Sequence, residues 1–160
     1  MAQSRPEVIA MSAASTLNFQ DALAFANQNQ VCWVATSQDD QPHVRGLLMW
    51  FADATGFYFH TGATKSLAEQ ISKNSRVEIA FYNSGEGPGK GRMMRVTGKV
   101  ERVIDAALEA RLVQERAWLK DMVAASAKGL LYMFRMPHGE IHDWTMATNL
   151  HEREQAPLVF

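Results

Sequence analysis

The stretch from Gln41 to Lys65 constrains the fold more than any other part of this chain. Its apolar and aromatic content predicts two β-strands, Pro42 to Ala52 and Gly56 to Thr61, joined by a short turn that ends in a glycine. A helix is expected to begin directly afterwards, near Thr64. The three elements together predict a sheet edge that runs straight into a helix N-terminus.

Two cations, Arg45 and Lys65, fall at neighbouring ends of this predicted sheet. A helix N-terminus offers free N–H groups, the hydroxyls of Thr61 and Ser66 add donors, and an arginine can bind two phosphate oxygens at once. The pattern is that of a phosphate site. The alternative is an exposed strand arginine beside an ordinary first-turn lysine, and local features taken alone favour that alternative.

Three segments occur in an order that is more specific than any one of them: VCWVATSQDDQPHVRGL, GFYFHTGATKSLAEQISKNSRVEIAF and MMRVTGKVERV. Over roughly Val31 to Val103 the chain therefore resembles the flavin-binding split-barrel family typified by pyridoxamine 5'-phosphate oxidase and its shorter relatives. The resemblance implies a mainly β fold with covering helices, a split β-barrel assembled as a homodimer. It also implies FMN as the cofactor, with two flavin sites at the dimer interface.

The same resemblance implies which residues hold the flavin. The phosphate would lie against Arg45 and Lys65, and the ring along the backbone from Arg45 to Met49. One departure is Gly46, where many short relatives have proline. Trp144 would pack near the flavin of the partner subunit, with a simple core tryptophan as the alternative. The full predicted cofactor site is Arg45, Gly46, Leu47, Leu48, His60, Thr61, Lys65, Ser66 and Trp144.

The predicted strand from Pro42 to Ala52 is apolar on both faces. A strand buried on both faces needs a surface beyond its own core, which in a small barrel is a bound ring, a second subunit, or both. The alternative is that the chain's own helices cover it. The first interpretation is the main argument from the residues themselves for a homodimer.

The remaining pattern predicts a single domain over residues 1–160, with 1–15 and 151–160 peripheral and loosely held. Besides the stretch already described, the expected elements are a helix to about Asn29, a strand Val31 to Ser37 with a polar hairpin turn, a helix Lys65 to Lys73, strands Arg76 to Tyr82 and Arg92 to Val103, a helix Asp105 to Ala127, and a final hairpin of Leu130 to Met136 and Glu140 to Trp144. The glycine-rich NSGEGPGKG segment precedes a strand and lacks a Ser or Thr after its lysine, so it is interpreted as a connection rather than a nucleotide loop.

Composition narrows the class of function. A net charge of −1 gives no general attraction for nucleic acid. No apolar run approaches the roughly 20 residues of a membrane span, and no leader segment is visible, so a cytoplasmic protein is expected. The single cysteine, Cys32, lies in an apolar strand and is expected to be buried. His138, His142 and His151 lie in a pattern that does not favour a metal site, so none is expected.

The predicted function is that of an FMN-binding flavoprotein, a flavin-dependent oxidoreductase acting on a small organic substrate. No residue is named as acid or base. The segment from Glu140 to Trp144 resembles the His-Asp pair of true pyridoxamine phosphate oxidases, but it lacks their flanking arginines, so vitamin B6 oxidation is expected to be absent or very weak. The alternative is a non-enzymatic flavin or haem carrier, with His43, His60 or a C-terminal histidine as axial ligand.

Overall fold

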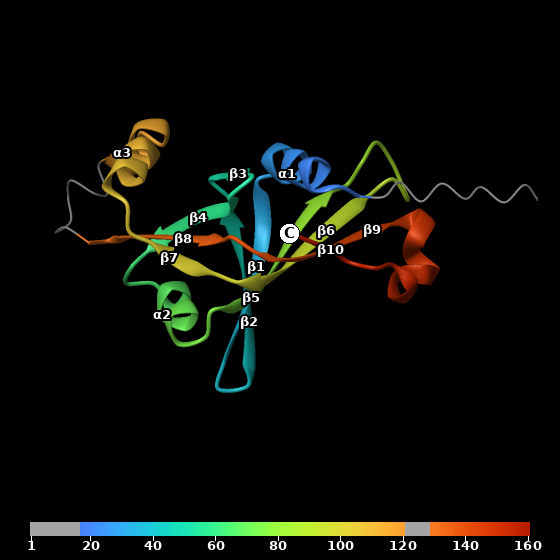
Figure 1. Ribbon diagram of the computed structural model, residues 1–160, viewed down its shortest axis with the longest axis horizontal. Coiled ribbons are helices and arrows are strands. Elements are labelled where there is room, and N and C mark those ends of the chain that lie inside the picture. Colours follow the sequence, from blue (N-terminus) through green and yellow to red (C-terminus); the bar gives the residue numbers. More distant parts are fainter. Residues whose placement is uncertain (1–16, 121–128) are drawn as a thin grey trace, which may run out of the picture.

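Ten strands form two antiparallel sheets in the computed structural model, which describes residues 17–120 and 129–160. The larger sheet has the order β10-β9-β6-β5-β1-β2 and the smaller one β3-β4-β8-β7 (Figure 1). The strands are β1 (Val31–Gln38), β2 (Gln41–Leu48), β3 (Phe51–Asp53), β4 (Gly56–Gly62), β5 (Arg76–Asn83), β6 (Arg92–Lys99), β7 (Glu101–Val103), β8 (Leu131–Met136), β9 (Gly139–Thr145) and β10 (Leu158–Val159). The prediction of a mainly β fold with covering helices is confirmed.

The helices are α1 (Phe19–Gln28), α2 (Ser66–Lys73), α3 (Ala106–Glu115) and a 3-10 segment η1 (Met146–Glu154). Asn18 caps α1 by accepting a hydrogen bond from the Asp21 amide at 2.9 Å, and α2 ends at Asn74. These two predicted helices are confirmed. None of the helices in the described ranges is long and apolar enough to cross a membrane.

Two segments that were predicted as single strands each divide between the two sheets. The predicted strand Pro42 to Ala52 is β2 followed by β3, and Arg92 to Val103 is β6 followed by β7. Met49 and Trp50 are buried at the first corner, where the Met49 amide donates to Gln30 O and the Trp50 amide to Tyr58 O, each at 2.9 Å. The sequence shows no break here, because the residues before, at and after the corner are all apolar.

The predicted final hairpin is wrong. Strand β8 pairs with β4 and β7 in the smaller sheet, whereas β9 pairs with β6 and β10 in the larger one. Pro137 lacks an N–H group and interrupts the ladder where the chain changes sheets. A Cβ on Gly139 would lie 2.3 Å from Thr97 O, so this corner requires glycine.

The predicted helix Asp105 to Ala127 is interrupted in the structure by residues 116–117, and residues 118–120 are helical again. Asp105 caps α3 as expected, accepting hydrogen bonds from the amides of Ala107 and Leu108, but the helix ends at Glu115. Arg116 follows with φ −116° and ψ 77°, which is not helical. Residues 121–127 of the predicted helix lie outside the described ranges, as do residues 1–15.

The last three residues, Leu158 to Phe160, are held in the fold, although residues 151–160 were expected to be loosely held. Leu158 pairs with Ile141 on β9, and the Phe160 amide donates to Gly139 O at 3.1 Å. The Phe160 ring stacks on Phe19 at 5.0 Å and meets Phe57 edge-on at 5.4 Å. The segment closes the core beneath α1.

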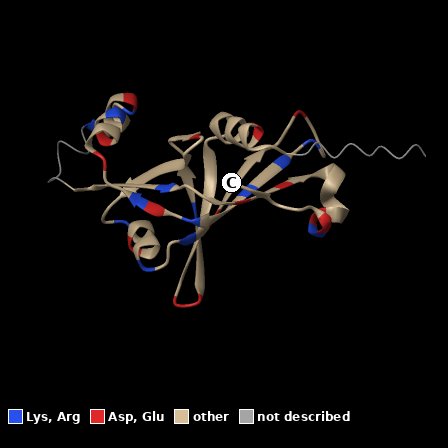
Figure 2. Ribbon diagram, in the orientation of Figure 1, with Lys and Arg blue, Asp and Glu red and all other residues tan. Residues whose placement is uncertain are grey.

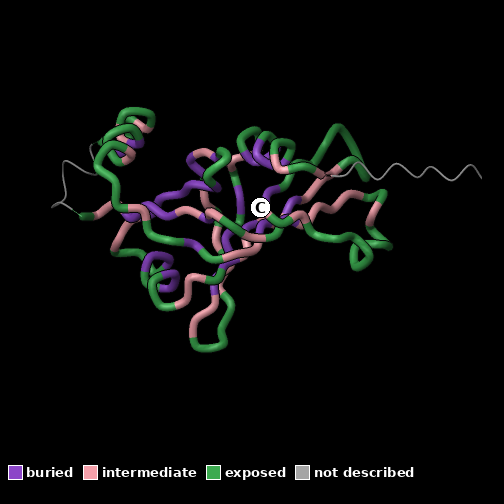
Figure 3. The backbone as a smooth tube through the Cα atoms, in the orientation of Figure 1, coloured by how far each residue is buried: buried purple, intermediate pink, exposed green. Residues whose placement is uncertain are grey.

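Buried residues, purple in Figure 3, form a smaller cluster that includes Leu112 of α3 and a larger cluster on both sheets, α1 and α2. Phe57, Phe59, Phe81 and Phe134 are fully buried within the larger cluster. Cys32 is also fully buried, as predicted, and this burial raises the pKa of its thiol to about 12. A thiol with that pKa is not a nucleophile at neutral pH.

One face of the larger sheet is left open to solvent. Cross-strand neighbours Val31 and Leu48, and Ala35 and Val44, share this face with Trp33. Val44 is 66% exposed and Trp33 44%. The alternative in which the chain's own helices cover this strand is therefore wrong for the described residues. We call this surface the open sheet face.

Candidate functional site

A pocket of about 160 Å³ lies where β2 and β4 end beside the N-terminus of α2. Leu47 and Leu48 come to it from β2, and His60 and Thr61 from β4. The remaining wall is formed by Gly62, Lys65, Arg116, Trp118, Leu119 and Leu131. The structure thus brings together Leu47, Leu48, His60, Thr61 and Lys65, which are five of the nine predicted site residues.

Arg45 precedes Leu47 by two residues on β2 and shares its face, but it does not line the pocket and lies against α2 instead. Its guanidinium donates to Thr36 Oγ1 at 2.7 Å and to Gln70 Oε1 on α2. Thr36 and Gln70 are both buried and also bond to each other at 2.6 Å. Burial lowers the pKa of Arg45, whose charge meets only neutral oxygens in the described structure.

Lys65 occupies the N-cap position of α2. Within the described residues no side chain caps this end, so the first N–H groups of the helix remain available to an anion. Ser66 is exposed on the first turn, and Thr61 is buried at the end of β4. The predicted helix start with an adjacent lysine is confirmed.

Arg116 closes the pocket from the end of α3. Its Nη2 donates to Met49 O at 2.6 Å and its Nη1 to Leu48 O at 3.4 Å, so it binds the backbone at the corner between β2 and β3. Nη1 also contacts Nε2 of His60. Burial lowers the pKa of Arg116, as it does for Arg45.

His60 is only 8% exposed and stands between cations. Burial, followed by the charges of Arg116 and Lys65, lowers the pKa of His60 to about 4. The imidazole is therefore neutral at physiological pH.

The charge balance of this region points to an anionic ligand. Arg45, Lys65 and Arg116 form no ion pair with any described carboxylate. Among the other described arginines, Arg92, Arg95, Arg111 and Arg135 each bind one, whereas Arg76, Arg102 and Arg153 also bind none that the structure describes. The acidic turn of Asp39 and Asp40 lies at the far end of the β1–β2 hairpin (Figure 2).

Four predicted site residues do not line the pocket: Arg45 and Ser66 lie beside it against α2, and Gly46 and Trp144 lie farther away. Gly46 points to the open sheet face, where an added Cβ would meet nothing within 4 Å. Trp144 lies on β9, and three strands lie between β9 and β2 in the larger sheet. The Nε1 of Trp144 donates to Asn149 Oδ1 at 3.2 Å. Within one chain Trp144 therefore cannot reach a ligand in the pocket.

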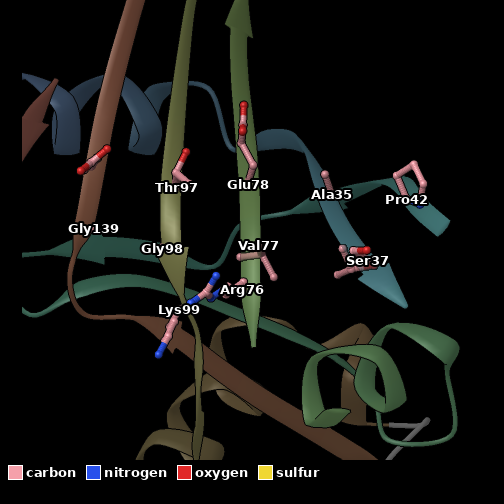
Figure 4. Close-up of a pocket in the computed structure, with 12 residues that line it drawn as sticks. Ala35, Ser37, Pro42, Arg76, Val77, Glu78, Thr97, Gly98, Lys99 and Gly139 are labelled. Carbon is pink, nitrogen blue, oxygen red and sulfur yellow. The ribbon is translucent and has the colours of Figure 1, made fainter. Parts of the chain in front are cut away.

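A larger hollow of about 610 Å³ crosses the opposite end of the open sheet face (Figure 4). Arg76 and Lys99 lie together at one end of it, and Glu78 lies farther along β5. None of the predicted flavin-site residues lines it. Its charges are of both signs, so it offers less attraction to an anion than the smaller pocket.

The segment from Glu140 to Trp144 lies on β9, next to two arginines of β6 that the sequence did not place there. Arg92 binds Asp143 at 2.8 Å, and Arg95 binds Glu78 at 3.3 Å and also Glu152. Carboxylates already neutralise both cations.

Sequence reasoning missed Arg116, Trp118, Thr36 and Gln70. Arg116 and Trp118 looked like positions on one continuous helix, because Leu112 and Leu119 keep helical spacing across the break. Thr36 and Gln70 belong to elements that were predicted, but these two contacting residues are 34 positions apart in the sequence. No local signal indicated either feature.

The two antiparallel sheets with this corner and pocket define a split β-barrel protein. A family model described as pyridoxamine 5'-phosphate oxidase matches residues 19–135, and the chain belongs to that family. The pyridoxine/pyridoxamine 5'-phosphate oxidase of Ectopseudomonas mendocina is 24% identical over 133 residues. The match covers 71% of this chain and 59% of that relative, so the chain spans less than two thirds of its length.

Solved structures share the fold. A NimC/NimA family protein from Clostridium acetobutylicum has a TM-score of 0.68 and 23% identity, covering 88% of this chain and 91% of its own. An FAD-binding protein from Mesorhizobium loti has a TM-score of 0.59 and 20% identity, covering 79% of this chain and 94% of its own. The heme storage protein HutZ from Vibrio cholerae has a TM-score of 0.59 and 13% identity, covering 79% of this chain and 93% of its own.

Proposed function

We propose that this chain binds FMN in the pocket between β2, β4 and α2 and uses it for redox chemistry on a small organic substrate. The observation that carries the proposal is the group of three cations, Arg45, Lys65 and Arg116, which bind no described carboxylate beside an uncapped helix N-terminus. A phosphate dianion would offset two of these three charges. Membership of the pyridoxamine 5'-phosphate oxidase family and an FAD-binding relative of the same fold agree with a flavin.

In this proposal Lys65 and the first amides of α2 hold the phosphate, with Ser66 and Thr61 as hydroxyl donors and Arg45 as the second cation. The ring lies along the backbone from Gly46 to Met49. When bound, the flavin would supply the hydride or electron transfer. The chain's own residues bind the cofactor, orient it and exclude water.

We further propose that a second copy of the chain completes the site. A volume of about 160 Å³ is smaller than the roughly 300–1,000 Å³ of typical ligand pockets. A partner seated on the open sheet face would bury Val44 and Trp33 and bring its own Trp144 toward the ring. The homodimer thus accounts for the exposed apolar surface and for the distant tryptophan.

The proposal does not extend to vitamin B6 oxidation. Glu140 is acidic where the resemblance calls for a phosphate-binding cation. Arg92 and Arg95 on the neighbouring strand are bound to Asp143, Glu78 and Glu152, so they do not supply the missing charge. A substrate phosphate would meet repulsion on this strand.

The first test is the visible spectrum of the purified protein, with identification of whatever is released on denaturation. Two flavin bands and released FMN support the proposal. A Soret band would favour a haem carrier instead, for which the fold of HutZ gives a precedent. In this chain Nε2 of His60 already contacts Arg116, which makes His60 a poor axial ligand.

The phosphate assignment is tested by the double variant Arg45→Ala/Lys65→Ala. Each charge-assisted hydrogen bond contributes ~1.5–3 kcal/mol, so loss of two should raise the Kd for FMN by at least roughly 100-fold and remove the preference for FMN over riboflavin. Lys73→Ala/Arg102→Ala removes the same charge from exposed positions that line neither the pocket nor the larger hollow, and it serves as the control. Unchanged FMN affinity in the first variant, with circular dichroism confirming its fold, would refute the assignment.

A further inference from the structure

Arg116 and His60 form a pair whose chemistry fixes the position of a proton. Arg116 comes from the break after α3, and His60 from the end of β4. Two carbonyl oxygens, Met49 O at 2.6 Å and Leu48 O at 3.4 Å, hold the guanidinium in place. Its Nη1 then faces Nε2 of the imidazole.

A guanidinium can only donate hydrogen bonds, so Nε2 of His60 must be the acceptor. The imidazole is neutral, because burial and the nearby charges of Arg116 and Lys65 lower its pKa to about 4. A neutral imidazole that accepts at Nε2 carries its hydrogen on Nδ1. The contact with Arg116 thus selects one tautomer.

The Nδ1–H group is available to a ligand. Nδ1 has no hydrogen-bond partner among the described residues, and these residues do not enclose it completely. His60 lines the pocket together with Lys65 and Leu48. A neutral donor in a partly buried site gives direction to a ligand without adding charge.

We propose that Arg116 is a positioning residue, which fixes His60 as an Nδ1–H donor to an acceptor atom of the flavin. This inference rests on the proposed FMN site and adds two named roles to it. His60 touches the cofactor, and Arg116 acts through His60 and through the backbone at the corner of β2 and β3. The acceptor is an oxygen or nitrogen of the ring, or an oxygen of the phosphate.

The test uses the full-length protein labelled with ¹⁵N at histidine. His60→Asn removes one of the five histidine signals and so assigns His60. We expect the Nδ1–H tautomer in the wild-type protein, and in Arg116→Lys, which keeps a donor. Arg116→Met, similar in length but without a donor, should lose the single tautomer and raise the pKa of His60.

The matched control is Arg111→Met on α3, where Arg111 binds Glu115 and stacks over Phe51 without touching His60. It should leave the His60 tautomer unchanged. FMN is then added to each protein. We expect the Kd for FMN to rise about tenfold in Arg116→Met and less than about threefold in Arg111→Met, as for the loss of one hydrogen bond.

Riboflavin distinguishes the two acceptors. A shift of the His60 Nδ1–H signal with both FMN and riboflavin assigns the ring as acceptor, and a shift with FMN alone assigns the phosphate. An Nε2–H tautomer in the wild-type protein, or a tautomer unaffected by Arg116→Met, would overturn the proposal even if FMN binds. The Nδ1–H tautomer without any FMN binding would instead refute the proposed function and with it the role of His60 toward flavin.

Discussion

At the scale of single residues, His60 shows how the fold sets a chemical state. The side chain is almost fully buried, so the charged form lacks hydration, and Arg116 and Lys65 add repulsion. A histidine in that position is held neutral well below the pH at which an exposed one would protonate.

This state predicts a pH dependence of stability. The pKa of His60 is about 4 in the folded protein, against an ordinary value of 6.5. Between these two values the unfolded chain binds a proton that the folded protein does not, so the free energy of unfolding should fall as the pH is lowered. The loss should reach ~3 kcal/mol near pH 4, and no His60 contribution should change above about pH 6.5.

Urea denaturation of the wild-type protein and of His60→Asn at several pH values measures this contribution. Other groups titrate in both proteins, so the difference between the two curves isolates His60. Parallel curves from pH 7 to pH 4 would contradict the buried, neutral histidine.

The sequence was informative about this site wherever neighbours in the chain are also neighbours in space. Lys65, Thr61 and His60 follow one another from strand to helix, and the structure keeps that order around the pocket. Arg116 was not predictable, because its contacts with Leu48 and Met49 span more than 60 positions and depend on a helix break. Long-range polar contacts leave no periodic signal in a sequence.

At the scale of elements, alternation predicted where strands lie but not which sheet they join. β2 runs into β3, and β6 into β7, through corners whose residues are as buried as the strands. The periodicity of apolar residues in a sequence indicates which residues are buried, and burial does not change at these corners. The corner at Pro137 was misread for a related reason, since a turn signal does not say whether the next strand folds back or passes to the other sheet.

The C-terminal strand is an element whose importance can be measured. Phe160 packs against Phe19 and Phe57 and is tied to Gly139 by its backbone. Phe160→Ala removes much of this half-buried contact, so the free energy of unfolding should fall by about 2 kcal/mol. Val159→Ala, at a neighbouring residue that is 72% exposed, should change it by less than about 0.5 kcal/mol.

Chemical denaturation of both variants at pH 7 distinguishes a structural strand from a loose tail. Equal stabilities for Phe160→Ala and the wild-type protein would show that the C-terminal residues are peripheral, as the sequence predicted.

At the scale of the whole molecule, the open sheet face connects the fold to the proposed site. Val31, Trp33, Val44 and Leu48 are exposed together on β1 and β2, and β2 is itself a sheet edge. Grouped apolar side chains of this kind mark interaction surfaces. Because Leu48 also lines the pocket, a partner seated on this face would adjoin the proposed flavin site.

The final prediction therefore joins assembly to cofactor binding. Val44→Glu places a charge in the middle of the open sheet face, where it cannot be buried without a large desolvation cost. The wild-type protein should run as a dimer in light-scattering chromatography, and Val44→Glu as a monomer with unchanged circular dichroism. Its affinity for FMN should fall at least about tenfold, although Val44 does not line the pocket.

The matched control is Ile104→Glu, since Ile104 is 83% exposed and lies between β7 and α3, away from the open sheet face. It should remain dimeric and bind FMN as the wild-type protein does. A monomeric Val44→Glu that keeps full FMN affinity would show that one chain suffices for the site, which would leave Trp144 as an ordinary strand residue. A wild-type monomer that still binds FMN would remove the dimer altogether and require another explanation for the exposed Trp33 and Val44.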